Sequence, residues 1–333
     1  MNRSPHVDSA AVSAAARRLE GKVLGTRVIG SPQIDLLCRR NVWFKAETLQ
    51  IGGSFKIRGA LNRLLQLDDA GRRAGVVAWS SGNHAQGVAA AARSVGTKAT
   101  IVMPSDAPRL KVDNTRQLGA EIVFYDRRTG DREQIARDLA AKTGAVIVPS
   151  YDDPDIIAGQ GTVALEFVEQ AAALGTTLDA VLVACSGGGL AAGCALALEA
   201  VSPTTALYTV EPEGFDDHAR SFASGRRERA DLQRVSICDA LQAPTPGELT
   251  FPVNRPRVAG GLVVTDAEVA RAMRVAFERL KLVVEPGGAV GLAALLAGKV
   301  PDRHARVGVV LSGGNVDAEV FARALLDGGT GDR

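Results

Sequence analysis

A single lysine stands behind two glycines and a serine in the segment GGSFKIRGA, residues 52–60. The apolar spacing that follows predicts a helix starting near Ser54, which puts Lys56 in its first turn. The helix dipole disfavours a cation there, and burial would favour the neutral, nucleophilic amine. The ordinary alternative is a solvated surface lysine, as most lysines are. Lys56 is therefore a candidate for covalent chemistry.

A second polar turn, Ser80-Ser81-Gly82-Asn83-His84, follows the apolar run GVVAWS and precedes an alanine-rich helical pattern. Free backbone amides and polar side chains at a helix start form a good cradle for a carboxylate. Helix N-capping by serine or asparagine explains the same residues without any ligand.

A third turn, Ser186-Gly187-Gly188-Gly189-Leu190, follows the run AVLVAC. Adjacent glycines let successive amides face an anion, and phosphate is the natural guest. Gly187, Gly189 and Ala192 also fit the spacing GxGxxA, and Glu211 ends the next predicted strand. A nucleotide-dependent oxidoreductase therefore stays open as an alternative.

A fourth turn places Ser312 before Gly313 and Gly314, where a tight turn alone would explain the glycines. Together the turns offer an amine, a carboxylate cradle, a phosphate cradle and a hydroxyl. Pyridoxal 5′-phosphate (PLP) would use all of them, since its aldehyde bonds to lysine and its phosphate needs an anion site. A nicotinamide enzyme would leave Lys56 and Ser312 without a role.

The segments that position these turns are predicted to be alternating strands and helices. Apolar, β-branched runs that predict strands occur at 75–80, 98–103, 120–125, 145–149, 180–185, 206–211 and 306–312. This rhythm predicts an α/β fold with mostly parallel sheets flanked by helices, in two lobes with the active site in the cleft between them. We expect residues 1–49 and 149–333 to form a large domain and residues 50–148 a small one. The Pro-, Gly- and charge-rich stretch 212–262 is expected to be mostly loop.

Composition excludes several classes of function. A formal net charge of +2 over 333 residues gives no reason to expect nucleic acid or a membrane as partner. The four cysteines lack CxxC spacing, which favours buried thiols in a reducing compartment. No stretch has the length of a membrane span or the core of a signal peptide, so a cytoplasmic location is the default expectation.

The motifs SFKIRGA, SSGNHAQG, IAGQGTVALE, SGGGL, VEPEG, EPGGAVGLAALL and LSGGN resemble the fold-type II PLP enzymes (tryptophan synthase β-like), and within them the threonine/serine dehydratase and serine racemase family. The resemblance runs from about Leu24 to Asn315. It implies that Lys56 binds the cofactor and then acts as base at Cα, and that Asn83 bonds the cofactor's phenolic oxygen. It implies further roles for Ser80–His84 at the substrate carboxylate, Ser186–Leu190 at the phosphate and Ser312 at the ring nitrogen.

The same resemblance implies a divalent-cation site at Glu211, Asp217 and the carbonyl of Phe215, where oxygen ligands would suit Mg²⁺ or Ca²⁺. Two solvated acids in a loop are the alternative. Ser81 stands where serine racemases carry serine and many dehydratases carry alanine, so it could return a proton to Cα from the face opposite Lys56. Otherwise Ser81 only caps its helix.

The hypothesis is thus a PLP-dependent ammonia-lyase that converts L-threonine, L-serine or a related 3-hydroxy amino acid to a 2-oxo acid and ammonia. A serine or aspartate racemase with side elimination is the alternative with the same cofactor. A non-catalytic protein that binds amino acids or PLP is a third reading. The resemblance implies a homodimer with a small amino acid as substrate.

Overall fold

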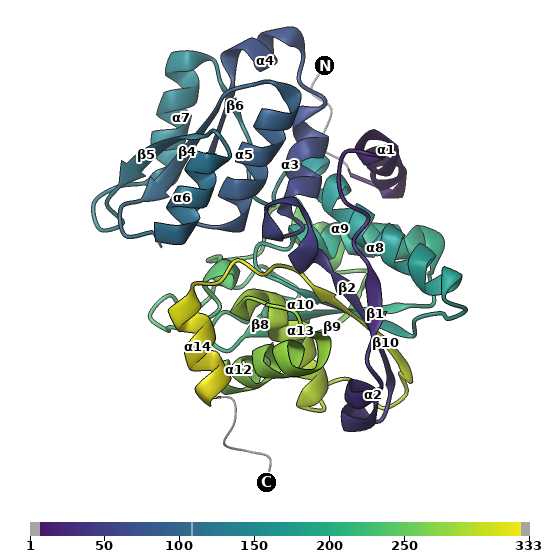
Figure 1. Cartoon of the computed structure of the whole chain (residues 1–333). Helices are drawn as coiled ribbons and strands as arrows, with labels where there is room; N and C mark the ends of the chain where they lie inside the picture. The colour runs from purple at the N-terminus through teal and green to yellow at the C-terminus, as the bar shows by residue number, and fades with distance from the viewer. Residues whose placement is uncertain (1–6, 108, 328–333) are drawn as a thin grey trace.

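The computed structural model describes residues 7–107 and 109–327, and its strands form two sheets (Figure 1). One sheet has six strands in the order β1-β2-β10-β7-β8-β9, and the other has four in the order β5-β4-β3-β6. Within the described residues every pairing is parallel except β1 with β2. The predicted α/β class with mostly parallel sheets is confirmed.

Helices cover both faces of the six-stranded sheet, which explains why its central strands are apolar throughout. In β7, Leu182 packs into the core on one face, while Val181 and Val183 pack into the core on the other. The strands are β1 (Val28–Gly30), β2 (Asn41–Ala46), β7 (Ala180–Ala184), β8 (Ala206–Pro212), β9 (Val258–Val264) and β10 (Arg306–Leu311). The covering helices are α1 (Ser9–Leu19), α8 (Pro154–Ala173) and α9 (Gly189–Val201) on one face, and α2 (Pro32–Cys38), α12 (Asp266–Val275), α13 (Pro286–Leu296) and α14 (Ala318–Asp327) on the other.

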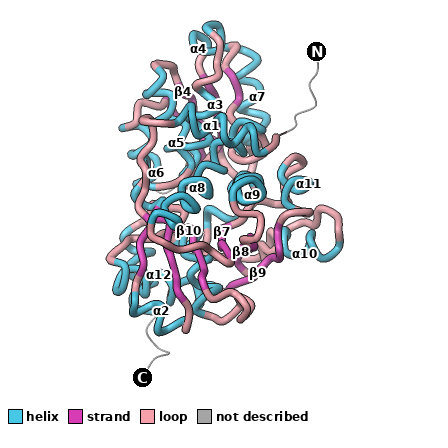
Figure 2. Tube along the Cα trace, turned by 90° about the vertical axis from the view of Figure 1, so that its right-hand side faces the viewer, coloured by secondary structure: helices cyan, strands magenta, loops and turns pink. Residues whose placement is uncertain are grey.

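The four-stranded sheet is built entirely from the middle of the sequence and lies in the upper half of Figure 1. Its strands are β3 (Val76–Trp79), β4 (Ala99–Pro104), β5 (Glu121–Tyr125) and β6 (Val146–Ile147). Its helices are α3 (Lys56–Leu64), α4 (Asp69–Ala74), α5 (Asn83–Val95), α6 (Arg109–Gln117) and α7 (Arg132–Thr143). Helices α8 and α9 pack against each other, and α8 also packs against α3, so α8 joins the two halves (Figure 2).

The strands of the two sheets fall within the segments assigned to the two domains, while the exact boundaries at 49/50 and 148/149 remain a prediction. Each predicted strand is present, but β1, β2 and β9 were missed. Within the part of the chain that the structure describes, no helix is both long and apolar enough to cross a bilayer.

Residues 212–262 lie mostly outside helices and strands, as expected, but the loop is interrupted by short regular elements. This stretch contains α10 (Asp217–Ser224), the 3₁₀ turn η3 (Asp239–Leu241), α11 (Thr250–Asn254) and the start of β9. Two glycines in β9 hid the strand, because glycine weakens a strand pattern. A Cβ on Gly261 would lie 2.6 Å from Cβ of Ala219, so glycine lets α10 pack directly on the strand.

Candidate active site

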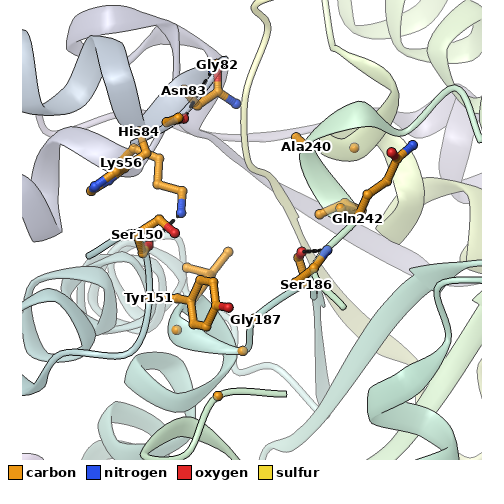
Figure 3. A pocket seen from close by; sticks show the side chains of 18 of the residues that line it. Lys56, Gly82, Asn83, His84, Ser150, Tyr151, Ser186, Gly187, Ala240 and Gln242 are labelled. Atoms are coloured by element: carbon orange, nitrogen blue, oxygen red, sulfur yellow. Dashed lines mark hydrogen bonds between the residues drawn. The ribbon is translucent and has the colours of Figure 1, made fainter. Parts of the chain in front are cut away.

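One cavity of about 440 Å³ between the two halves brings all the predicted turns together (Figure 3). Its volume is in the range of small-ligand sites. Its lining includes every residue predicted for the cofactor and the substrate carboxylate: Lys56, Ser80, Ser81, Gly82, Asn83, His84, Ser186, Gly187, Gly188, Gly189, Leu190 and Ser312. The residues that the sequence singled out therefore line one cavity, while their individual roles stay predictions.

Lys56 is the first residue of α3, as predicted, and its amine donates a hydrogen bond to the Ser150 carbonyl at 2.8 Å. Figure 3 shows the side chain reaching into the cavity toward Ser150. Burial lowers the pKa of Lys56 to about 8, and the negative charge of Glu285 works in the opposite direction. The lowered pKa raises the fraction of neutral amine near neutral pH, and the neutral amine is the form that attacks an aldehyde.

The phosphate loop, Ser186–Leu190, connects β7 to α9. Gly188 has φ +93°, and a Cβ there would lie 2.7 Å from Cε1 of His218. A Cβ on Gly187 would collide with the Tyr151 ring. Glycine is thus required by backbone conformation at one position and by space at the other, which fits a loop shaped to bring amides close to an anion.

The carboxylate loop, Ser80–His84, connects β3 to α5. Asn83 is held at both ends of its amide, because Nδ2 donates to Glu285 and Oδ1 accepts from Asn315 at 2.8 Å. His84 lies beneath the loop with its Nε2 2.9 Å from the Val148 carbonyl, and burial lowers its pKa to about 3. A neutral His84 supports the loop and brings no positive charge to a carboxylate.

Ser312 follows β10 and is buried at the base of the cavity. Its carbonyl accepts from the Phe55 amide at 3.1 Å, which ties the start of α3 to the six-stranded sheet. The hydroxyl of Ser312 and the amine of Lys56 therefore reach one cavity from the two halves of the molecule.

Sequence reasoning missed several residues of the site. Glu285, just before α13, is buried, one of its carboxylate oxygens has no partner among the described residues, and burial raises its pKa to about 7. Lys111 of α6 is buried and forms an ion pair with Asp239 of η3, across the cleft. The segment EPGGAV was noticed as a motif, but only the fold shows that its glutamate faces Asn83.

The predicted metal ligands Glu211 and Asp217 are both buried, so the alternative of two solvated acids in a loop is wrong. Glu211 accepts from the amides of His218 at 2.9 Å and Ala219 at 2.8 Å. Burial raises the pKa of Asp217 to about 7, and one of its oxygens is buried without a partner among the residues that the structure describes. Within the described chain, no group of three His, Cys, Asp or Glu side chains is placed to hold a metal ion. The predicted set does not conflict with this, because it has only two acidic side chains and its third ligand is the main-chain carbonyl of Phe215.

The fold and the site define an enzyme with a reactive lysine beside a glycine-rich anion loop. A family model described as "Pyridoxal-phosphate dependent enzyme" matches residues 19–313, and the chain belongs to this family. It is 50% identical over 311 residues to an L-threo-3-hydroxyaspartate ammonia-lyase of a Pseudomonas species, covering 93% of this chain and 96% of that one. A yeast (Saccharomyces cerevisiae) L-threo-3-hydroxyaspartate ammonia-lyase is 43% identical, with 93% and 94% covered. The structure of maize serine racemase superposes with a TM-score of 0.90 at 38% identity, covering 96% of this chain and 97% of that one.

Family membership confirms the predicted cofactor and enzyme class. It argues against a nucleotide-dependent oxidoreductase and against a non-catalytic binding protein. The residues present also fit PLP. The cavity holds an amine of lowered pKa, a loop whose glycines leave space for an anion, and a buried hydroxyl in Ser312.

Proposed function

We propose that this PLP-dependent ammonia-lyase of 3-hydroxy amino acids acts on L-threo-3-hydroxyaspartate in preference to threonine or serine. The observation that carries the choice is the guanidinium of Arg132 in the cavity lining. The lining also contains Lys111 and Arg227, but these cations are paired with Asp239 and Glu248. A second carboxylate on the substrate needs such a partner, whereas the methyl group of threonine does not. The relatives from Pseudomonas and yeast, which are named for this substrate, support the proposal.

When bound, PLP supplies an aldehyde that links to the substrate amine and a ring that withdraws electrons from Cα. Ser186–Leu190 would hold its phosphate, Asn83 its phenolic oxygen and Ser312 its ring nitrogen. A neutral serine hydroxyl would not keep the ring nitrogen protonated, so the bound cofactor would withdraw electrons from Cα less strongly and prompt loss of a β-substituent would be favoured. This favours elimination over slower reactions at Cα.

Lys56 takes the Cα proton, because burial lowers its pKa to about 8 and so provides neutral amine, which can accept a proton. Ser80–His84 would hold the α-carboxylate with backbone amides and hydroxyls. The Lys111 amine lies 3.6 Å from where a Cβ of Gly82 would stand, which puts a positive charge beside this loop. The β-hydroxyl then leaves as water, and hydrolysis of the resulting enamine gives a 2-oxo acid and ammonia.

The experiment is a comparison of kcat/KM for oxo-acid formation from L-threo-3-hydroxyaspartate, L-threonine and L-serine. We expect at least a tenfold preference for hydroxyaspartate, and equal rates on threonine would contradict the substrate. Arg132→Met should lower the hydroxyaspartate rate and leave the threonine rate unchanged. Arg128→Met, an exposed arginine outside the cavity lining, is the matched control.

Lys56→Ala tests the role of the lysine itself. We expect oxo-acid formation to fall at least about a thousandfold, because both the covalent anchor and the base are lost. The visible absorption of the bound cofactor should change at the same time. A variant that keeps both the absorption and the rate would remove Lys56 from its assigned role.

Serine racemisation is the second candidate, and the observation that favours it is that Ser81 lines the same cavity as Lys56. Ser81→Ala should abolish exchange between D- and L-serine and retain oxo-acid formation from hydroxyaspartate. Unchanged exchange in this variant would reduce Ser81 to a helix cap.

For Glu211, Asp217 and the Phe215 carbonyl we propose a structural Mg²⁺ or Ca²⁺ site, supported by the unpartnered buried oxygen of Asp217. Added cation should raise the melting temperature of the wild type, and chelation should lower it. Asp217→Asn should remove this response. The homodimer and the cytoplasmic location remain predictions.

A further inference from the structure

Two buried side chains lie beneath the phosphate loop and hold its carbonyl groups. The hydroxyl of Thr250 donates to the Gly187 carbonyl at 2.6 Å, and Nδ2 of Asn254 donates to the Gly188 carbonyl at 3.2 Å. Both residues belong to α11 and are fully buried. Neither lines the cavity, so any effect on a ligand must act through the loop.

The direction of these carbonyls sets the direction of the amides. A trans peptide is planar and puts its C=O and its N–H on opposite sides. A Gly187 carbonyl held toward α11 therefore turns the Gly188 N–H away from α11, and the Gly188 carbonyl does the same for the Gly189 N–H. Within the part of the chain that the structure describes, neither amide has a protein acceptor. Both are therefore available to an anion in the cavity.

Helix α11 is itself held in place by the segment that precedes α8. The carboxylate of Asp152 accepts from the amides of Glu248 at 2.9 Å, Leu249 at 2.9 Å and Thr250 at 3.2 Å. Asp152 lies two residues after Ser150, whose carbonyl accepts from the Lys56 amine. One short segment, 150–152, thus connects the lysine to the support of the phosphate loop.

We propose that Thr250 and Asn254 are positioning residues that preset the Gly188 and Gly189 amides for the cofactor phosphate. A loop without this support would have to order its peptides when the phosphate binds, and that ordering lowers affinity. The inference rests on the cofactor of the family and is independent of which hydroxyamino acid is the substrate.

The test is titration of the apoenzyme with PLP and, separately, with pyridoxal, which has the same ring and aldehyde without the phosphate. Thr250→Val removes the hydroxyl with little change of shape. We expect its dissociation constant for PLP to rise about fivefold, the effect of one hydrogen bond, with no change for pyridoxal. Thr250→Ser keeps the donor and should bind PLP as the wild type does. The ³¹P resonance of bound PLP should shift in Thr250→Val and stay in place in Thr250→Ser.

Thr209→Val is the matched control, because Thr209 is equally buried and its hydroxyl has no partner among the described residues. Circular dichroism and the melting temperature of each apoenzyme check folding. Should Thr250→Val not fold, Asn254→Asp supplies the same comparison, since it replaces the donor by an acceptor of equal size. An unchanged PLP constant, an equal loss for PLP and pyridoxal, or an equal loss in Thr209→Val would overturn the proposal.

Discussion

The phosphate loop and the carboxylate loop both follow a parallel strand and lead into a helix, yet they are held in different ways. The phosphate loop is supported from within its own half of the molecule by Thr250 and Asn254. The carboxylate loop depends on contacts across the cleft, from Asn83 to Glu285 and to Asn315. Its Ser80, Ser81 and Gly82 are only partly buried, while Gly187–Leu190 are buried.

This difference indicates that the two loops depend on different parts of the molecule for their binding functions. The proposed phosphate site lies on a loop that is supported within one half of the molecule, so its affinity should depend little on how the halves meet. The substrate site is completed by both halves, and changes at their contacts should appear mainly in KM. The following predictions test that distinction, beginning with the largest effect.

Gly188→Ala and Gly82→Ala compare the same change in the two loops. Gly188 has φ +93°, and its Cβ would lie 2.7 Å from the His218 ring, so strain of about 1–3 kcal/mol adds to a collision. Around Gly82 the nearest atom would be 3.6 Å away, an ordinary contact. We expect PLP affinity to fall about a hundredfold in Gly188→Ala and less than twofold in Gly82→Ala.

Titration of each apoenzyme with PLP, after its melting temperature has been checked, measures this contrast. Similar losses in both variants would mean that the two loops do not differ in preorganisation.

Lys111→Met removes the cation of the ion pair that crosses the cleft to Asp239. We expect KM for the hydroxyamino acid to rise about tenfold, while the dissociation constant for PLP stays unchanged. The substrate then loses a cation beside the carboxylate loop, while Asp239, which is half exposed, stays hydrated. Arg109→Met, on the same helix but exposed, is the control and should leave both constants unchanged. A larger effect on the dissociation constant for PLP than on KM would contradict the claim that contacts across the cleft act mainly on substrate binding.

Glu285→Gln should give the smallest effect, on the pH dependence of cofactor capture. The Glu285 carboxyl has a pKa raised to about 7, so above that pH its charge stabilises the Lys56 ammonium and raises the pKa of Lys56. Removing the charge lowers the pKa of Lys56, so more amine is neutral at a given pH. The rate of PLP capture by the apoenzyme should therefore rise with pH through a midpoint that lies lower than in the wild type.

Stopped-flow absorbance of the forming complex across pH 6–10 measures this midpoint. Glu133→Gln, at another acid of the cavity lining, should leave it in place. A midpoint that stays fixed or moves to higher pH in Glu285→Gln would show that Glu285 does not act on Lys56.

Much of the site was readable from the sequence because its chemistry is local. Gly188 needs a positive φ, Lys56 needs a helix start, and each turn follows a recognisable apolar strand. Parallel strands bring their carboxyl ends to one edge of a sheet, so turns far apart in the chain can be expected to meet. The class of fold, the cofactor and the loops that meet at the cavity followed from these patterns.

Only the tertiary structure decided how those turns are held. Glu285, Lys111 and Thr250 carry no signal of their own, since a glutamate, a lysine and a threonine are common anywhere in a sequence. Their roles come from burial and from partners more than 60 residues away. Strand β9 was likewise hidden, because its glycines make sense only against the packed α10. Neighbouring residues determine the local backbone conformation, whereas desolvation and long-range hydrogen bonds exist only once the chain has folded.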